Sequence, residues 1–130
     1  MNLLRGGVYQ PGVCNIGSVE ITRRRRAGHV GLILTIVTLG VLAAIGAPPL
    51  ARLLVGLPAI MAATGYLQAW FRFCVAFGSA GVFNFGPTGT TAAVPDAAAR
   101  SRDRATALRI GLIAATIGVS AGVLAAALPV

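Results

Sequence analysis

The chain alternates between long apolar stretches and shorter segments that carry nearly all of its charge. Charged side chains are missing from three stretches of about twenty residues each, 28–47, 53–71 and 110–128. A helix rises about 1.5 Å per residue, so about twenty residues are enough to cross a hydrocarbon core of roughly 30 Å. The pattern predicts an all-α integral membrane protein with three transmembrane helices, at about 28–47, 53–71 and 108–128.

The remaining residues form a leader, a short link and one long connection. Residues 1–22 mix glycine, proline and short polar residues, which predicts an extended or turn-rich segment. It belongs to an expected cytoplasmic leader, 1–27, in front of one three-helix transmembrane domain, 28–130. Pro48 and Pro49 are expected to end the first span, because proline lacks an amide donor and clashes with the preceding turn. The short link behind them makes the first two spans an antiparallel pair.

The connection 72–107 is expected to be cytoplasmic and partly interfacial. The region 66–85 contains seven of the eight aromatic side chains, and aromatic rings favour the boundary between hydrocarbon and headgroups. This region could extend the second span, lie flat on the membrane, or form a re-entrant turn at Gly78 and Gly81. The polar loop behind it is expected to become helical near Asp96.

The arginines predict the orientation. The chain has eleven of them and no lysine. Ten lie in the leader or in the long connection and its flanks, and only Arg52 lies in the short link. Positive side chains resist translocation, so we expect a cytoplasmic N-terminus and an external C-terminus in the inner membrane. In the alternative, residues 1–47 are a secretory signal; the long leader and full-length span are unlike one.

The composition agrees with a membrane protein. Hydrophobic residues make up 56% of the chain and charged residues 11%, against about half and about a quarter in soluble domains. A net charge of +8 would suggest nucleic-acid binding in a soluble protein. Here the apolar spans already account for where the arginines lie, so we expect the lipid bilayer, and no nucleic acid, as the partner of this charge.

Small residues recur along the spans. The third span has one at every fourth position: Ala114, Gly118, Gly122 and Ala126. The first span has a shorter version at Gly40 and Ala44, and the second span has Ala59 and Ala63. Helices in lipid associate through the close backbone approach that small residues permit. These stripes could close the three-helix bundle on itself or bind a partner chain, and both possibilities stay open.

Few side chains are suited to catalysis or transport. The centres of the spans contain no acid, lysine or histidine, which proton relays and ion pathways normally need. The sequence also shows no HExxH motif, paired carboxylates or Ser-His-Asp arrangement. We therefore expect neither an autonomous enzyme nor an autonomous transporter, and the sequence identifies no cofactor.

Cys14, Cys74 and His29 are the candidates for a metal site. On the expected topology all three lie on the cytoplasmic side, and thiolate and imidazole are common zinc ligands. The wide separation of the two cysteines differs from the paired spacing of most zinc sites. Buried, unreactive thiols and a structural histidine are the alternative.

Two of the acids, Glu20 and Asp103, are candidates for ion pairs with arginines nearby in sequence. Glu20 precedes Arg23 and Arg24 at helical i+3 and i+4 spacing, which favours a local ion pair. Asp103 lies beside Arg100 and Arg104, and a solvated charge pair is expected there.

Three strings together make up a little under half of the chain: CNIGSVEITRRRRAGHVGL, LPAIMAATGYLQAWFRFCVAFGSAGVFNFG and DRATALRI. They resemble short multi-pass bacterial membrane proteins to which no activity is assigned. The resemblance implies no activity, cofactor or site, but it directs attention to the polar residues within the strings: Cys14, Asn15, Glu20, Arg72, Cys74 and Asn84. We expect the leader to fold back onto the segment 72–86, with Glu20 and Arg72 as candidates for pairing.

The leading hypothesis for function is an accessory subunit. Such a protein would pack against other subunits of a larger membrane complex, respiratory or photosynthetic, and stabilise it without catalysing a reaction. One alternative is a cytoplasmic-face thiol or metal site for redox sensing or metal handling. Another is the binding of a lipid, quinone or pigment by the aromatic segment.

Overall fold

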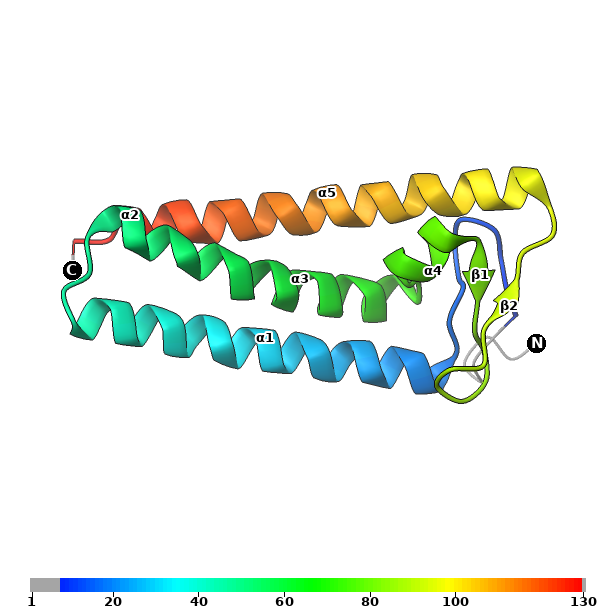
Figure 1. Ribbon diagram of the computed structural model, residues 1–130, viewed down its shortest axis with the longest axis horizontal. Coiled ribbons are helices and arrows are strands. Elements are labelled where there is room, and N and C mark those ends of the chain that lie inside the picture. The colour runs from blue at the N-terminus through cyan, green and yellow to red at the C-terminus, as the bar shows by residue number, and fades with distance from the viewer. Residues whose placement is uncertain (1–7, 130) are drawn as a thin grey trace.

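Three long helices dominate the computed structural model, which describes residues 8–129. The elements in chain order are α1 (Ser18–Ala44), α2 (Pro49–Arg52), η2 (Leu53–Val55), α3 (Gly56–Phe71), α4 (Val75–Ala80), β1 (Val82–Phe83), β2 (Ala92–Ala93) and α5 (Ala97–Ala127). The helix α3 packs against both α1 and α5 and lies between them (Figure 1). The short elements α4, β1 and β2 gather at one end of the bundle, and α2 lies at the other (Figure 1).

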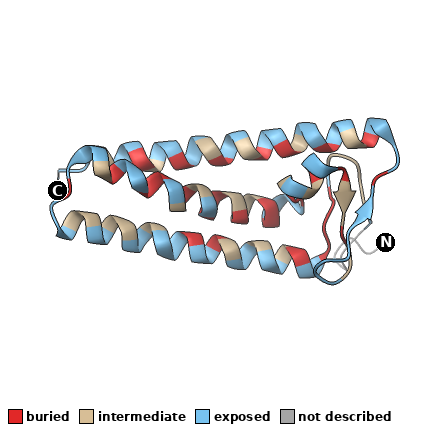
Figure 2. Cartoon of the chain, viewed as in Figure 1, coloured by how far each residue is buried: buried red, intermediate tan, exposed pale blue. Residues whose placement is uncertain are grey.

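Three helical segments are long and apolar enough to cross a membrane: Ser18–Ala44, Pro49–Phe71 and Ala97–Ala127. The prediction of three such helices is therefore confirmed. Their buried residues face the neighbouring helices, and the outer faces are exposed (Figure 2). Many of the exposed side chains are large and apolar, as with Ile36 at 63% and Val119 at 61% exposure.

The first helix begins earlier than its apolar stretch. It starts at Ser18, so residues 18–22 of the segment expected to be extended or turn-rich are helical, and the arginine block lies within α1. Glu20 stands in the first turn, where a carboxylate complements the partial positive charge of a helix N-terminus. The same carboxylate pairs with Arg24 at i+4 and Arg23 at i+3, which offsets the repulsion among the four consecutive arginines.

The helix α1 ends before the two prolines. Gly46 adopts a positive φ of 68°, and the amides of Gly46 and Ala47 bind the carbonyls of Ala43 and Leu42. This is the Schellman arrangement, in which a left-handed glycine terminates a helix. Pro49 then occupies the first turn of α2, where a missing amide donor costs little.

The second span ends at Phe71 and does not continue past Arg72. Arg72 takes the left-handed conformation, with φ of 53°, and reverses the chain after α3. Gln68 fastens this reversal, because its side-chain oxygen accepts from the Val75 amide at 2.8 Å and its carbonyl accepts from the Phe73 amide at 3.0 Å. A second left-handed residue, Gly81, ends α4.

The expected helix start near Asp96 is confirmed. The Asp96 carboxylate accepts from the Ala99 amide at 2.9 Å and caps α5. This helix then continues without a break through the third apolar stretch to Ala127.

The closest helix contact joins α1 to α3. Gly28 and Gly31 of α1 face Gly65 and Ala62 of α3. A Cβ atom on Gly65 would lie 2.7 Å from the Arg24 carbonyl oxygen and closer still to the Gly28 amide nitrogen. The two backbones therefore touch here, and only glycine fits.

The small pair of the first span does not pack within the described bundle, so of the two possibilities only contact with a partner chain stays open for it. Gly40 and Ala44 are exposed, and a Cβ on Gly40 would have nothing within 4 Å. The reason is that α1 meets α3 closely around Gly28 and Gly31, in its N-terminal half, and leaves its other end less covered (Figure 2).

The stripe on the third span closes the bundle. Gly118 and Gly122 contact Gly56, where a Cβ on Gly56 would lie 2.8 Å from the Gly118 carbonyl oxygen. Ala114 is 1% exposed on the same face. Ala126 is partly exposed, and Ala125 takes the buried position in the last turn. The stripe therefore packs against the same chain.

Arg52 ties the α2 end of the bundle together. It is 3% exposed, and its guanidinium donates to four carbonyl oxygens at 2.9–3.0 Å: those of Ala47, Ala125, Ala126 and Leu128. Three of these carbonyls belong to the end of α5, where the last acceptors of a helix lack partners within it. The positive charge also complements the partial negative charge of that helix end.

A matched pair of substitutions tests the α1–α3 contact. We expect Gly65→Ala to destabilise the bundle by about 1–3 kcal/mol, because the new methyl group meets backbone atoms that cannot move independently. Gly40→Ala makes the same change in open space and should be neutral or stabilising by up to about 1 kcal/mol, through helix propensity. Unfolding in detergent measures both. Equal stabilities for the two variants would contradict this packing.

Candidate functional site

The polar residues of the chain gather at the end of the bundle that holds α4, β1 and β2. Residues 8–17 and 72–96 form this region, which we call the polar cap. Three backbone hydrogen bonds join its two parts: Asn15 N to Arg72 O at 3.1 Å, Asn84 N to Asn15 O at 2.9 Å, and Gly17 N to Asn84 O at 2.9 Å. The prediction that the leader folds back onto the segment 72–86 is confirmed.

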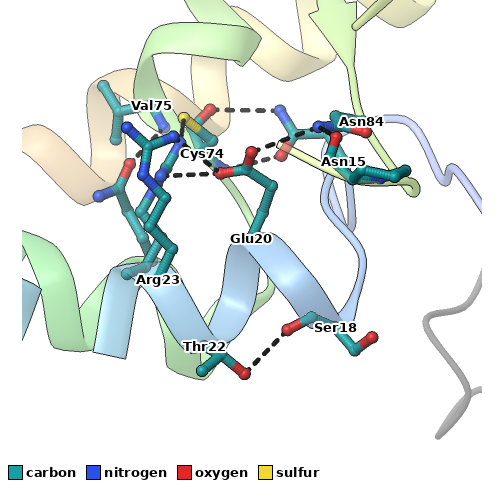
Figure 3. A network of polar contacts seen from close by, with 11 residues as sticks. Asn15, Ser18, Glu20, Thr22, Arg23, Cys74, Val75 and Asn84 are labelled. Carbon is teal, nitrogen blue, oxygen red and sulfur yellow. Dashed lines mark hydrogen bonds and ion pairs between the residues drawn. The ribbon is translucent and has the colours of Figure 1, made fainter. Parts of the chain in front are cut away.

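Asn15 fixes the turn between α3 and α4 to the leader. It is fully buried. Its side-chain oxygen accepts from the Cys74 amide at 2.7 Å, and its side-chain nitrogen donates to the Cys74 carbonyl at 3.2 Å. An asparagine amide matches a peptide group in this way because it offers one donor and one acceptor side by side. Figure 3 shows Asn15 facing Cys74.

Glu20, in the first turn of α1, is a buried acid that contacts the polar cap. It is 0% exposed, and its carboxylate lies 2.9 Å from Nη1 of Arg24 and 3.6 Å from Nη1 of Arg23. The other carboxylate oxygen accepts from Nδ2 of Asn84 at 3.3 Å (Figure 3). A buried charge is tolerated only when it is paired, and the guanidinium one turn along α1 supplies the pair.

The predicted pairing of Glu20 with Arg72 is wrong. The ion pairs of Glu20 among residues 8–129 are with Arg23 and Arg24. Arg72 follows the C-terminus of α3 and has an exposed side chain, and its carbonyl accepts a hydrogen bond from the Asn15 amide of the leader.

Arg24 links the acid to a thiol. Its Nη2 lies 2.9 Å from Sγ of Cys74, and its guanidinium stands over the Phe77 ring at 5.5 Å from the centroid. Cys74 itself is 1% exposed. One arginine therefore joins α1 to the start of α4 through a carboxylate, a sulfur and an aromatic face.

Asn84 orders the loop behind β1. Its side-chain oxygen accepts from the Gly86 amide at 2.8 Å and from the Thr90 hydroxyl at 3.0 Å. Its side-chain nitrogen donates to the Pro87 carbonyl at 2.9 Å as well as to Glu20. Each hydrogen-bonding group of this buried amide is in use, so Asn84 has a positioning role.

Asp103 forms a second buried polar contact. The expectation of a solvated pair with neighbouring arginines is wrong, because Asp103 is 0% exposed. Its carboxylate accepts from the Tyr9 hydroxyl at 2.6 Å and the Gly12 amide at 2.7 Å. Thr106 adds a hydrogen bond to the Gly12 carbonyl at 2.7 Å. Burial, with the hydrogen bond to Asp103 and its negative charge, raises the pKa of Tyr9.

The three predicted metal ligands are not brought together. Within residues 8–129 no three His, Cys, Asp or Glu side chains are placed to hold a metal ion. His29 lies on α1 beyond the polar cap and meets the Tyr66 hydroxyl at 2.7 Å. The Cys14 thiol contacts the Ile16 carbonyl, whereas Cys74 faces Arg24. Both cysteines are buried, and burial raises the pKa of Cys14.

A cavity of about 410 Å³ opens between the leader, the end of α3 and the middle of α5. Its lining residues include two arginines, Arg72 and Arg109, and the apolar residues Phe71, Ile110 and Ile113. No acidic residue lines it. The candidate functional site is thus a buried polar network beside a cavity that is lined by arginines and by apolar side chains.

No protein-family model, curated protein or solved structure matches this chain.

The predicted local ion pair of Glu20 with Arg23 and Arg24 is confirmed. Sequence reasoning missed the contacts of Arg24 with Cys74 and Phe77 and both partners of Asp103. The i+4 spacing from Glu20 was the available signal for Arg24, but four consecutive arginines gave no indication of which one is buried. Nothing in the sequence distinguishes Tyr9 and Gly12 as partners of a residue on α5, more than ninety positions away.

Labelling of Cys74 tests the Asn15 contact. In a Cys14→Ser background Cys74 is the only thiol. We expect Asn15→Ala to raise its rate of alkylation about tenfold or more, because two buried peptide groups lose their partners at about 1–3 kcal/mol. Val13→Ala in the same leader changes an exposed side chain and should leave the rate unchanged. Continued protection of Cys74 in Asn15→Ala would refute the assigned role.

Titration of Tyr9 tests the Asp103 contact. Tyr66→Phe leaves Tyr9 as the only tyrosine, and its ionisation, followed by ultraviolet absorbance, should begin above the ordinary pKa of about 10. Asp103→Asn in the same background should lower the pKa of Tyr9 part of the way back.

The raised pKa also sets the sign of a stability effect. Below pH of about 10 Tyr9 is protonated in both states and its contribution to folding is complete. Above this pH Tyr9 ionises in the unfolded state before it ionises in the folded state, so its contribution to the free energy of folding falls as pH rises. In Tyr9→Phe the free energy of unfolding should fall less steeply with pH above about 10. An unchanged slope would contradict the contact between Tyr9 and Asp103.

Proposed function

We propose that this chain is an accessory subunit of a larger complex in the cytoplasmic membrane, with a cytoplasmic N-terminus and an external C-terminus. In this proposal the three long helices cross the bilayer and the polar cap lies on the cytoplasmic side. The exposed apolar side chains then meet lipid or partner helices. In water a continuous apolar surface of this kind would be a liability.

One observation supports association most directly. The helix α1 packs against α3 and makes at most marginal contact with α5. Beyond Gly31, its side chains are exposed or partly exposed up to the turn after the helix. Gly40 and Ala44, spaced by four residues, lie on this uncovered part, and the space beside Gly40 is open. A glycine in an exposed helix interior weakens the helix, so a use in close packing would explain it.

We propose a transmembrane helix of another membrane protein as the occupant of this face of α1. Other small residues already pack between helices of this chain: Gly28 contacts Gly65, and Gly56 contacts Gly118 and Gly122. The unused pair on α1 offers a flat site of the kind that a second helix can approach closely. The buried polar network supports this role by holding the near end of α1 in place.

Site-specific crosslinking tests the proposal. A photoreactive amino acid at position 40 should form a crosslink to a membrane protein in intact membranes, and one at position 111 should not. Gly111 is the matched control, because a Cβ there also has nothing within 4 Å. The double variant Gly40→Leu/Ala44→Leu should reduce co-purification of the crosslinked protein about tenfold or more, and Gly111→Leu should leave it intact.

Two results would overturn the proposal. One is a crosslink from position 40 only to a second copy of this chain, which would indicate self-association. The other is undiminished co-purification in the double variant. Recovery of the chain outside the membrane fraction would instead overturn the membrane placement itself.

A further inference from the structure

The cavity beside the polar cap combines two kinds of surface. Its cationic part comes from Arg72, at the end of α3, and Arg109, on α5. Its apolar part comes from Phe71, Ile110 and Ile113. A volume of about 410 Å³ falls within the range of sites that bind small molecules.

The change from polar to apolar runs through the cavity itself. On α3 the charge-free stretch ends at Phe71 and Arg72 follows it. On α5 Arg109 precedes Ile110, where the charge-free stretch begins. Both helices therefore change character at the same level, so a ligand here would meet guanidinium groups at one end and hydrocarbon at the other.

The acids of the described chain have other partners. Glu20 pairs with Arg24, Asp103 accepts from Tyr9 and Gly12, and Asp96 caps α5. None of them lines the cavity. Within residues 8–129, Arg109 forms no ion pair with any of these acids. The positive charge of Arg109 is thus available to an anionic ligand.

We propose that this cavity binds the phosphate of an anionic phospholipid, with its acyl chains along Ile113 and Phe71. A guanidinium binds phosphate through two parallel hydrogen bonds, and basic pockets between helices on the cytoplasmic side suit phospholipid headgroups. Trp70 also lines the cavity and is 80% exposed, as expected for an aromatic ring at the headgroup boundary. The assignment rests on the membrane placement proposed above, but needs no partner protein.

The single tryptophan gives a direct readout. Trp70 is the only tryptophan of the chain. The purified protein is reconstituted into phosphatidylcholine vesicles that contain a small share of brominated phosphatidylglycerol or, in parallel, the same share of brominated phosphatidylcholine. We expect the anionic lipid to quench Trp70 fluorescence about fivefold more effectively, the factor that one arginine contributes near an anionic headgroup.

Arg109→Gln should abolish most of this preference. The matched control is Arg104→Gln, which removes one positive charge from an exposed position on the same helix, outside the cavity lining, and should retain it. Equal quenching by the two lipids in the unmodified protein would overturn the proposal. An equal loss in both variants would also overturn it, since diffuse surface charge would then be the cause.

Two further arms separate the remaining explanations. Inorganic phosphate, added against chloride of equal ionic strength, should leave the preference unchanged, and its loss would mean that the cavity takes free phosphate and not a lipid. No quenching by either brominated lipid would show that Trp70 is not in a bilayer, which is a failure of the membrane placement. A normal crosslink from position 40 in Arg109→Gln shows that the partner site is separate.

Discussion

The contact between the backbones of α1 and α3 at Gly28 and Gly65 sets the position of everything at the polar end of the molecule. Because neither residue has a side chain, the two helices touch, and a Cβ on Gly65 would lie 2.7 Å from the Arg24 carbonyl. This contact fixes α1 in both translation and rotation against α3. Arg24 lies one turn from Gly28 and Glu20 one turn further, so their side chains reach the start of α4 and β1.

The polar cap follows from the need to pair every buried polar group. A carboxylate as buried as Glu20 is costly unless a charge and hydrogen bonds compensate it. Arg24 supplies the charge and Asn84 a hydrogen bond, and Asn84 in turn organises the loop that follows. Asn15 satisfies the peptide groups of Cys74 in the same way. These side-chain contacts hold the leader, α1 and the start of α4 together as one unit.

The long helices could be predicted because their signals are local. The length of the uncharged stretches predicts the three membrane-spanning helices, and Asp96, a residue type that caps helices, predicts the start of α5. The earlier start of α1 was harder, since it depends on Glu20 neutralising part of an arginine block that alone disfavours a helix. The internal packing of Gly118 and Gly122 could not be decided, because a stripe of small residues fits a partner as well as the same chain.

The polar contacts were predictable only where one partner was close in sequence. The folding back of the leader was expected in outline, but the partners of Asp103 were not, because they lie in the leader and on α5. The metal hypothesis failed for a related reason. Sharing one side of the bundle does not bring side chains into contact, and His29 is turned toward Tyr66 while each thiol has a separate partner.

The arginines have different roles, and this bears on the proposed orientation. A count of arginines treats every guanidinium as equal, yet Arg52 is buried and its guanidinium donates hydrogen bonds to four carbonyl oxygens. It is the one arginine that stands at the α2 end of the described chain. Its guanidinium binds carbonyl groups at the end of α5, so the α2 end of the bundle has no exposed arginine among residues 8–129. The other end keeps exposed arginines on α1 and α5, such as Arg26 and Arg104. The asymmetry in exposed charge is therefore greater than the count suggests, and it supports a polar cap that faces the cytoplasm.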